Sequence, residues 1–191
     1  MEFKIEKAVV YGLDKSIIAS GNAMRTTMQD NELEAEEKDY KRACNLGTTK
    51  SGEGHDNFLN GIIVQFDIYA PLYMWKQLQR YHFLDFISSQ STMHRLTKFD
   101  IKEQCTKDVD KFILSRYQEI LEEYNAGNID LWRKLVASLP CGFVLGATMT
   151  TNYRQLKTIY HQRKKHKLKE WRDFCKWCDT LPHFKELCHG K

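Results

Sequence analysis

The residue types best suited to chemistry gather in the last third of the chain. Asn152 and Arg154 follow a Thr-Thr pair, and Arg163, His166 and Glu170 come soon after them. Asn offers amide donors, and Arg adds a permanent positive charge with its donors in a fixed fork. Such a group suits an anionic ligand. The simpler alternative is a capped amphipathic helix with a solvated basic end.

The spacing predicts that one helix carries most of these residues. Leu156 and Ile159 recur at a helical interval, and the preceding Thr-Thr-Asn segment is a suitable helix cap. At about 100° per residue, one side of this helix carries Asn152, Leu156, Ile159 and Arg163, and the other side carries Arg154.

Two groups of potential metal ligands were weighed against structural roles. Cys175-x-x-Cys178, with a Cys-His pair further on, resembles a zinc set. Both cysteines share a helical pattern with bulky aromatic residues, so burial in the core explains them better. His166 and Glu170 are four residues apart but lack an obvious third ligand. We therefore expect no metal site.

A basic run at residues 163–167 would also suit the phosphates of nucleic acid. A solvated helix end explains the same run, and the net charge of +4 is too small to favour nucleic acid over a small anion. The chain has no glycine-rich phosphate loop. Nucleic acid is therefore the less favoured ligand.

The elements that must position these residues follow from hydrophobic periodicity. Alternating apolar residues predict strands at residues 4–11, 62–70 and 139–149, and Pro71 and Pro140 bound the last two. Helical spacing predicts helices at residues 15–27, 31–42, 72–86, 101–124, 129–137 and 170–178. The expected inward residues of the 101–124 helix include Phe112 and Ile113, and those of the 15–27 helix include Ala23 and Met24.

These elements lack a regular βαβ rhythm, so the expected class is α+β. A length of 191 residues suits one domain spanning residues 1–191. No apolar run reaches membrane-spanning length, and the N-terminal segment does not read as a signal peptide. We expect a cytoplasmic protein without a membrane partner, whose six cysteines are reduced.

Two ordered blocks of residues resemble the flavin-dependent thymidylate synthase family. In the first block, Gly54-His55-Asp56 precedes a strand ending at Ala70-Pro71, and Gln77 and Arg80 follow. This order is similar to the family's Gly-His-Glu segment, Ala-Pro strand end and Gln-x-x-Arg helix. The second block runs from Leu139-Pro140 through the Asn152-x-Arg154 pair. It continues with Arg163, His166 and Glu170, like the family's Asn-x-Arg, Arg and His-x-x-x-Glu series.

The resemblance covers residues 54–95 and 139–172 and contains clear departures. The family's Arg-His-Arg reads Arg80-Tyr81-His82 here. Its Ser-x-Arg is missing at the expected offset, and Ser91 and Arg95 stand four residues apart. Val136 replaces a family arginine. These departures affect the expected phosphate contacts most.

The resemblance implies a fold with a mixed sheet packed with long helices, and it implies roles for individual residues. Arg163 would be the catalytic residue, stabilising charge on the pyrimidine ring. The residues expected to bind FAD are His55, Arg80, His82, Asn152, Arg154 and His166. The residues expected to bind the nucleotide are Gln77, Arg80, Ser91, Arg95 and Arg163.

The implied reaction is reductive methylation of dUMP to dTMP by a homotetramer. FAD is the cofactor, and methylenetetrahydrofolate and NADPH are co-substrates. One alternative is a relative acting on another pyrimidine deoxynucleotide monophosphate, for instance in hydroxymethylation of dCMP. The other is a non-catalytic module that binds a nucleotide or nucleic acid through the basic run.

Overall fold

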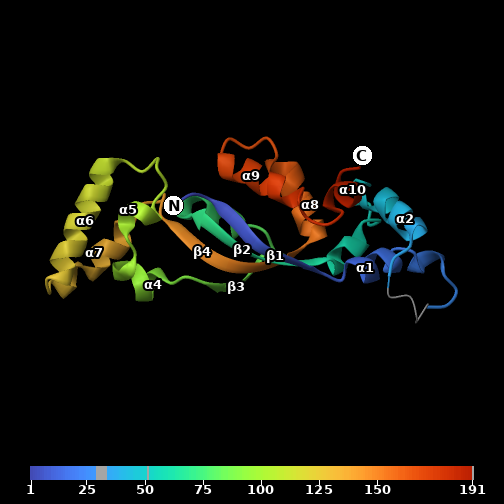
Figure 1. Cartoon of the computed structure of the whole chain (residues 1–191), viewed down its shortest axis with the longest axis horizontal. Coiled ribbons are helices and arrows are strands. Elements are labelled where there is room, and N and C mark those ends of the chain that lie inside the picture. The colour runs from blue at the N-terminus through green and yellow to red at the C-terminus, as the bar shows by residue number, and fades with distance from the viewer. Residues whose placement is uncertain (29–33, 51, 191) are drawn as a thin grey trace. The chain divides into compact units, whose positions relative to one another are not determined.

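The computed structural model describes residues 1–28, 34–50 and 52–190 (Figure 1). Its strands are β1 (Lys4–Tyr11), β2 (Ile63–Pro71), β3 (Asp85–Ser89) and β4 (Val144–Asn152). Its helices are α1 (Leu13–Ala19), α2 (Glu37–Gly47), α3 (Leu72–Leu78), α4 (Thr92–Arg95), α5 (Ile101–Gln104), α6 (Lys111–Asn125), α7 (Trp132–Ala137), α8 (Tyr153–Arg163), α9 (Lys169–Cys178) and α10 (Phe184–Cys188). The predicted α+β class is confirmed.

The strands form one antiparallel sheet in the order β1-β2-β4-β3. The described chain divides into two compact units. The first comprises Met1–Glu6, Asp67–His82 and Phe86–Met149, and the second comprises Lys7–Phe66, Phe83–Asp85 and Thr150–Lys191. Because the unit boundaries fall inside the strands, each strand contributes residues to both units. The two units are described separately below.

The predicted strands match the structure closely. β2 alternates as predicted, with Val64, Phe66, Ile68 and Ala70 buried. β1 begins and ends as predicted, whereas β4 begins later than expected, at Val144. Strand periodicity is a strong signal in β2 because its alternating buried residues all lie on one face of the strand.

The helix predicted at residues 72–86 is wrong in its second half. α3 ends at Leu78, and residues 85–89 form the edge strand β3. Beyond its end, the N–H of Gln90 donates to the carbonyl of Gly146 at 2.9 Å, and Gly146 donates back to the side chain of Gln90 at 2.8 Å. Sheet pairing, which local spacing cannot reveal, overrides the helical pattern.

The helix predicted at residues 101–124 is interrupted. α5 ends at Gln104, where Cys105 bridges to Phe143, and Asp110 then caps α6 by accepting the N–H of Phe112 at 2.7 Å. The interruption rotates the face that α6 presents to the core. Phe112 is therefore 81% exposed and Ile113 50% exposed, so both core predictions are wrong.

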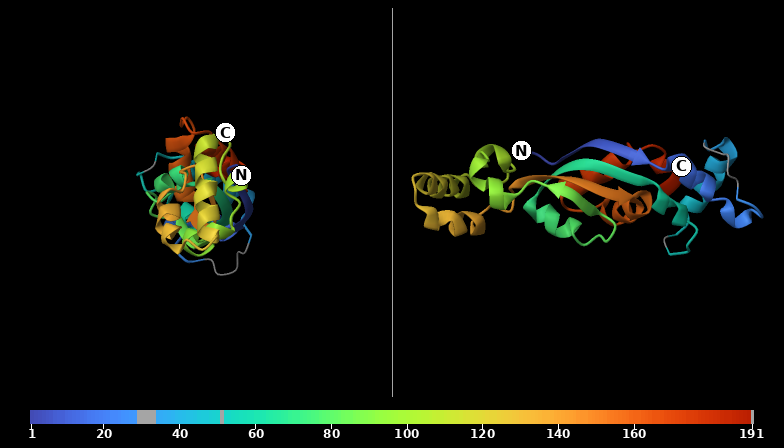
Figure 2. Two further views of the ribbon diagram at one scale, coloured as in Figure 1. Left: turned by 90° about the vertical axis from the view of Figure 1, so that its left-hand side faces the viewer. Right: turned by 90° about the horizontal axis from the view of Figure 1, so that it is seen from below.

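The first unit is organised around this helical region. Figures 1 and 2 show α6 and α7 side by side. Its buried cluster consists of Leu96, Ile101, Cys105, Tyr117, Ile120, Leu121, Leu135 and Phe143. Most of these residues lie on helices that are joined by turns. The turns bring the residues together, so the core forms without one long helix.

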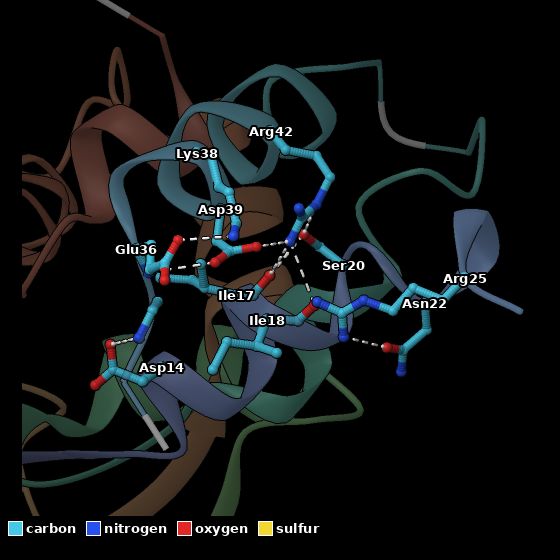
Figure 3. A network of polar contacts seen from close by, with 11 residues as sticks. Asp14, Ile17, Ile18, Ser20, Asn22, Arg25, Glu36, Lys38, Asp39 and Arg42 are labelled. Carbon is cyan, nitrogen blue, oxygen red and sulfur yellow. Dashed lines mark hydrogen bonds and ion pairs between the residues drawn. The ribbon is translucent and has the colours of Figure 1, made fainter. Parts of the chain in front are cut away.

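In the second unit, α1 ends earlier than the predicted 15–27 helix because Arg42 binds its last turn (Figure 3). The guanidinium donates to the carbonyls of Ile17 and Ile18 at 3.2 and 3.3 Å and pairs with Asp39 at 2.6 Å. A cation at a helix C-terminus satisfies unpaired carbonyls and opposes the helix dipole. Ala23 and Met24 follow in a 3-10 turn and are exposed, so both were wrongly predicted as core.

The buried Asp39 in this network ionises readily despite its surroundings. Burial opposes its ionisation, but hydrogen bonds from Arg42 and from the backbone N–H of Glu36 outweigh that effect, so its pKa lies below the usual value. The sequence predicted a charge-rich helix at residues 31–42. Of that range, residues 31–33 lie outside the described residues, and α2 begins at Glu37.

The core of the second unit combines β2, α9 and α10. The Phe66 ring lies 4.6 Å from Trp177 and 6.4 Å from Phe174 between centroids. α10 was not predicted, yet Phe184 in it is fully buried and packs edge-on against Tyr153. In the ranges that the structure describes, no helix is long and apolar enough to span a membrane.

We predict that Gly47→Ala destabilises the second unit. A Cβ at this position would lie 2.2 Å from the carbonyl oxygen of Leu187 in α10 and 3.2 Å from the Phe58 ring. Because the nearest atom is backbone, the helices must shift, and the free energy of unfolding should fall by about 1–3 kcal/mol in urea titrations. Asn45→Ala, at an exposed position of α2, is the matched control. Equal stability of the two variants would contradict the prediction.

Candidate functional site

The candidate site begins where β4 runs directly into α8. The side chain of Asn152 accepts the N–H of Gln155 at 2.8 Å, which confirms Asn152 as the helix cap. Directly after Asn152, the N–H of Tyr153 donates to the carbonyl of Ile62 at 3.0 Å. These two hydrogen bonds hold the junction between β4 and α8. They therefore fix where the first side chains of α8 emerge.

Asp56 forms ion pairs with two cations of α8. One carboxylate oxygen lies 3.1 Å from Nε of Arg154, and the other lies 2.8 Å from Nζ of Lys157. The Asp56 and Lys157 side chains are 1% and 3% exposed, whereas that of Arg154 is 35% exposed. One negative charge therefore meets two positive charges, and the surplus positive charge is on the accessible Arg154.

Arg154 and Asn152 line a cavity of about 370 Å³. The full lining is Asp56, Asn60, Phe83, Asn152, Arg154, Gln155 and Thr158. Among the described residues, neither the terminal nitrogens of Arg154 nor the amide nitrogen of Asn152 has a hydrogen-bond partner. The cavity thus offers unpaired donors and positive charge, which suits a ligand rich in acceptors or negative charge.

At the other end of α8, Arg163 stacks on Trp171 of α9. The centre of its guanidinium lies 4.6 Å from the ring centroid, and Trp171 is fully buried. Arg172 holds the intervening turn by donating to the carbonyls of His166 and Lys167, both at 2.7 Å. A planar guanidinium on an immobile ring has a defined orientation, which a flexible lysine would lack.

His166 lies in this turn and is neutral at neutral pH. Burial, with the positive charges of Arg163 and Arg172, lowers its pKa below the usual value. The N–H of Leu168 donates to its Nδ1 at 3.1 Å, so the ring proton resides on Nε2. His166 can therefore donate one hydrogen bond without adding charge. Its predicted role in flavin binding stays a prediction.

The remaining predicted site residues lie in or around the first unit's α3 and α4, apart from His55. Gln77 is partly buried near the end of α3, and Arg80 and His82 are exposed just after it. Ser91 caps α4: its hydroxyl accepts the N–H of His94 at 3.3 Å and lies 2.9 Å from the Nδ1 of the same residue. Arg95 ends this helix and is exposed. Ser91 and Arg95 thus belong to one helical turn.

Sequence reasoning missed Asp56 and Lys157 as site residues. Asp56 was noted only as part of the Gly-His-Asp segment, and His55 beside it is exposed. Lys157 lies between the buried Leu156 and Ile159, a position from which a lysine normally reaches solvent. Only its partner, 101 residues earlier in the chain, explains its burial. The signal available was the i,i+3 spacing of two cations at a helix start.

The cysteines of α9 and α10 are buried as core residues. Burial raises the pKa of Cys175 to about 11 and raises that of Cys178 well above its usual value. Both thiols are therefore protonated at neutral pH in the metal-free chain. Across the described ranges, no group of three or more potential ligands could hold a metal ion. The expectation of no structural zinc stays a prediction, testable by metal analysis.

We predict that Asp56→Asn lowers the free energy of unfolding by about 3–5 kcal/mol, because it leaves Lys157 buried without a counter-ion. Urea denaturation measures this loss. Glu53→Gln, an exposed change in the same loop, is the charge-matched control and should have little effect. A loss below about 1 kcal/mol for Asp56→Asn would show that the pair behaves like a surface salt bridge.

Comparison with solved structures identifies the fold. A flavin-dependent thymidylate synthase ThyX from Helicobacter pylori, complexed with FAD and dUMP, matches with a TM-score of 0.71 at 18% identity, covering 98% of each chain. A second Helicobacter pylori ThyX structure with FAD and dUMP matches with a TM-score of 0.68 at 18% identity, covering 98% of this chain and 97% of that one. The UMP/dUMP methylase PolB from Streptomyces cacaoi, bound with 5-Br dUMP, matches with a TM-score of 0.64 at 15% identity, covering 97% and 91%.

No protein-family model and no curated protein sequence matches the chain. The likeness is therefore one of structure, at low sequence identity and over nearly the full length. The fold that the ordered residue blocks predict is confirmed: this chain has the fold of the flavin-dependent thymidylate synthases.

Proposed function

We propose that this chain is a flavin-dependent enzyme that transfers a one-carbon unit to C5 of a pyrimidine deoxynucleotide monophosphate. In its most specific form, the proposal is reductive methylation of dUMP to dTMP, with FAD, methylenetetrahydrofolate and NADPH. The observation that carries it is a full-length match to a fold crystallised with FAD and dUMP, in a chain whose Asn152 and Arg154 open onto one cavity.

The donors of this cavity fit a flavin. Reduced flavin is negatively charged near N1, and FAD also carries a diphosphate, so it needs cations and N–H donors. Arg154 supplies a cation and Asn152 an amide donor, and both lack competing partners for these groups within the described chain. When bound, the reduced flavin would supply a hydride to C6 of the pyrimidine. His55, Arg80, His82 and His166 are the further residues we assign to FAD.

Arg163 is the residue we assign to the pyrimidine. Addition at C6 would place negative charge on C5 and O4 of the ring, and a fixed guanidinium at the O4 and N3 edge would stabilise this charge until C5 attacks the one-carbon unit. Stacking on Trp171 holds the guanidinium plane before the substrate arrives. Such a preorganised donor needs no reorientation during the reaction.

We assign the nucleotide phosphate to Gln77, Arg80, Ser91 and Arg95. A phosphate dianion needs charge-assisted hydrogen bonds, and Arg95 is exposed at the end of α4. Ser91 occupies the cap of the same helix, so both groups move as one unit. Product formation from dUMP, together with the visible absorption spectrum of the protein with added FAD, tests the proposal as a whole.

The departures from the family pattern at residues 80–82 and 91–95 motivate a second candidate, hydroxymethylation of dCMP. The phosphate is common to dUMP and dCMP, so contacts to the base decide between the two reactions. Ser91 already binds His94, and Tyr81 stands in the middle of the Arg80-Tyr81-His82 segment, so the pocket differs from the family pattern. Incubating the enzyme with dUMP and dCMP separately and analysing the products by mass spectrometry distinguishes the two reactions.

We also propose a homotetramer, in which sites are shared between subunits. Arg154 and Arg163 emerge from different parts of α8, one at the Asp56 cavity and one at Trp171. One helix can therefore serve two separate sites. Light scattering at micromolar protein with FAD present should report four chains, and a monomer would contradict this.

Arg154→Ala should weaken FAD binding by about 1–3 kcal/mol, because a charged hydrogen-bond donor is lost. Titration of FAD, followed by quenching of flavin fluorescence, measures the affinity. Arg133→Ala, an exposed arginine on α7, is the control and should bind FAD like the parent. Unchanged affinity in Arg154→Ala would remove Arg154 from the flavin site.

Arg163→Lys should bind FAD normally but lose turnover by about 10²–10³-fold, the effect of removing one donor to a developing anion. Lysine keeps the charge but loses the planar fork and the stacking on Trp171. Arg163→Ala should also lose nucleotide affinity. Lys165→Ala, in the same basic run, is the control with parental turnover. Turnover of Arg163→Lys at the parental rate would make Arg163 one cation among several.

A further inference from the structure

We propose that Asp56 is a positioning residue: it orients the guanidinium of Arg154 toward its ligand, and the buried Lys157 is the counter-ion that keeps Asp56 in place. The naming of flavin as that ligand rests on the function proposed above. The orientation of Arg154 itself rests only on the contacts of Asp56, Arg154 and Lys157.

The geometry of the pair leaves the useful part of Arg154 open. Asp56 binds Nε at 3.1 Å rather than the two terminal nitrogens. A guanidinium has five N–H donors in a fixed fork. Holding it by Nε restricts its plane and leaves the pair of terminal nitrogens for a partner. Those nitrogens have no partner among the residues described, and Arg154 lines the cavity.

Lys157 fixes the orientation of the Asp56 carboxylate relative to Arg154. Its Nζ binds the second carboxylate oxygen at 2.8 Å and the carbonyl of Thr49 at 2.8 Å. The carboxylate therefore has one oxygen for each cation and cannot rotate without leaving one of them unpaired. The bond to Thr49 also ties the loop before Asp56 to α8. The position of Asp56 relative to Arg154 is thus determined by two contacts of one buried amine.

Local stability does not explain two cations here. Arg154 and Lys157 lie in the N-terminal half of α8, where the helix dipole disfavours positive charge, and the first turn holds no acidic residue. Like charges at i,i+3 also repel each other. An apolar residue in place of a buried ion pair is often equally stable or more so. Arg154 and Lys157 thus depart from the usual charge preferences of a helix start. Such a departure indicates a functional requirement, here an oriented positive charge at the cavity.

The decisive experiment removes the clamp without leaving a buried charge unpaired. Asp56→Leu/Lys157→Met takes away both buried charges and the acceptor of the Arg154 Nε–H, and keeps Arg154. Glu53→Gln, an exposed charge change in the same loop, is the matched control. Two readouts are independent: the Arg154 Nε–H resonance in ¹⁵N spectra, identified by its loss in Arg154→Ala, and the dissociation constant for FAD.

We expect the double variant to fold, to lose the protected Nε–H resonance and to bind FAD about 10–100-fold more weakly, the range for one charged hydrogen bond. Glu53→Gln should retain the resonance and bind FAD within about threefold of the parent, because its exposed side chain lies outside the clamp. A double variant that binds FAD as tightly as the parent would overturn the positioning role. Persistence of the Nε–H resonance in the double variant would overturn the clamp itself.

A second variant keeps the test decisive if the double variant unfolds. Asp56→Glu retains all the charges but displaces the carboxylate by one methylene. It should shift the Nε–H resonance and weaken FAD binding, whereas an unchanged resonance and affinity would overturn the proposal. A parental chain that takes up no FAD would instead overturn the proposed function. Loss of the resonance in the double variant would then still support the clamp.

Discussion

The buried carboxylate of Asp56 is the interaction on which the candidate site depends. It pairs with Lys157, whose side chain is 3% exposed, and it holds Arg154 at the cavity. It also joins a loop to a helix that lies about a hundred residues later in the chain. Replacing one partner leaves a buried charge, so the three residues act as a unit rather than as additive contributions. The stability of this part of the fold and the electrostatics of the cavity therefore have the same origin.

Each end of α8 carries an arginine whose guanidinium is oriented by a neighbouring side chain, and the neighbours differ in kind. At its start, Arg154 is oriented by a carboxylate, and at its end Arg163 is oriented by the face of Trp171. A carboxylate neutralises part of the positive charge it holds, whereas an aromatic ring leaves the charge almost intact. The ring suits a guanidinium that must stabilise charge developing on a substrate. The carboxylate suits a guanidinium that binds a ligand already charged, beside a lysine that restores the lost positive charge.

Much of the fold could be predicted where the pattern repeats over many residues. The alternation in β2 and the spacing of Leu156 and Ile159 in α8 predicted both elements and their buried faces. Predictions failed where distant partners decide the outcome. Residues 85–89 form a strand because β4 is available to pair with them, and Phe112 is exposed because Asp110 starts a new helix. The burial of Lys157 could not be predicted for the same reason. A lysine is buried only if its counter-ion is present, and periodicity carries no information about a residue as distant as Asp56.

Arg163 matches the family pattern, whereas the segment at residues 91–95 departs from it. This difference has a chemical reason. Stabilising charge at the edge of a pyrimidine requires a planar donor that stays charged, and only arginine offers both, so Arg163 has few substitutes. A phosphate accepts hydrogen bonds in many directions, and serine, lysine, amide N–H groups or arginine can each bind it. A chain can therefore rebuild its phosphate contacts and keep its base contact. The roles proposed for Ser91, Arg95 and Arg163 follow this pattern, since Ser91 and Arg95 share one helical turn and Val136 stands in place of a family arginine. Under the proposed assignment of Arg163 to the pyrimidine, specificity between uracil and cytosine depends on the groups near Arg163 rather than on the phosphate, which both nucleotides share.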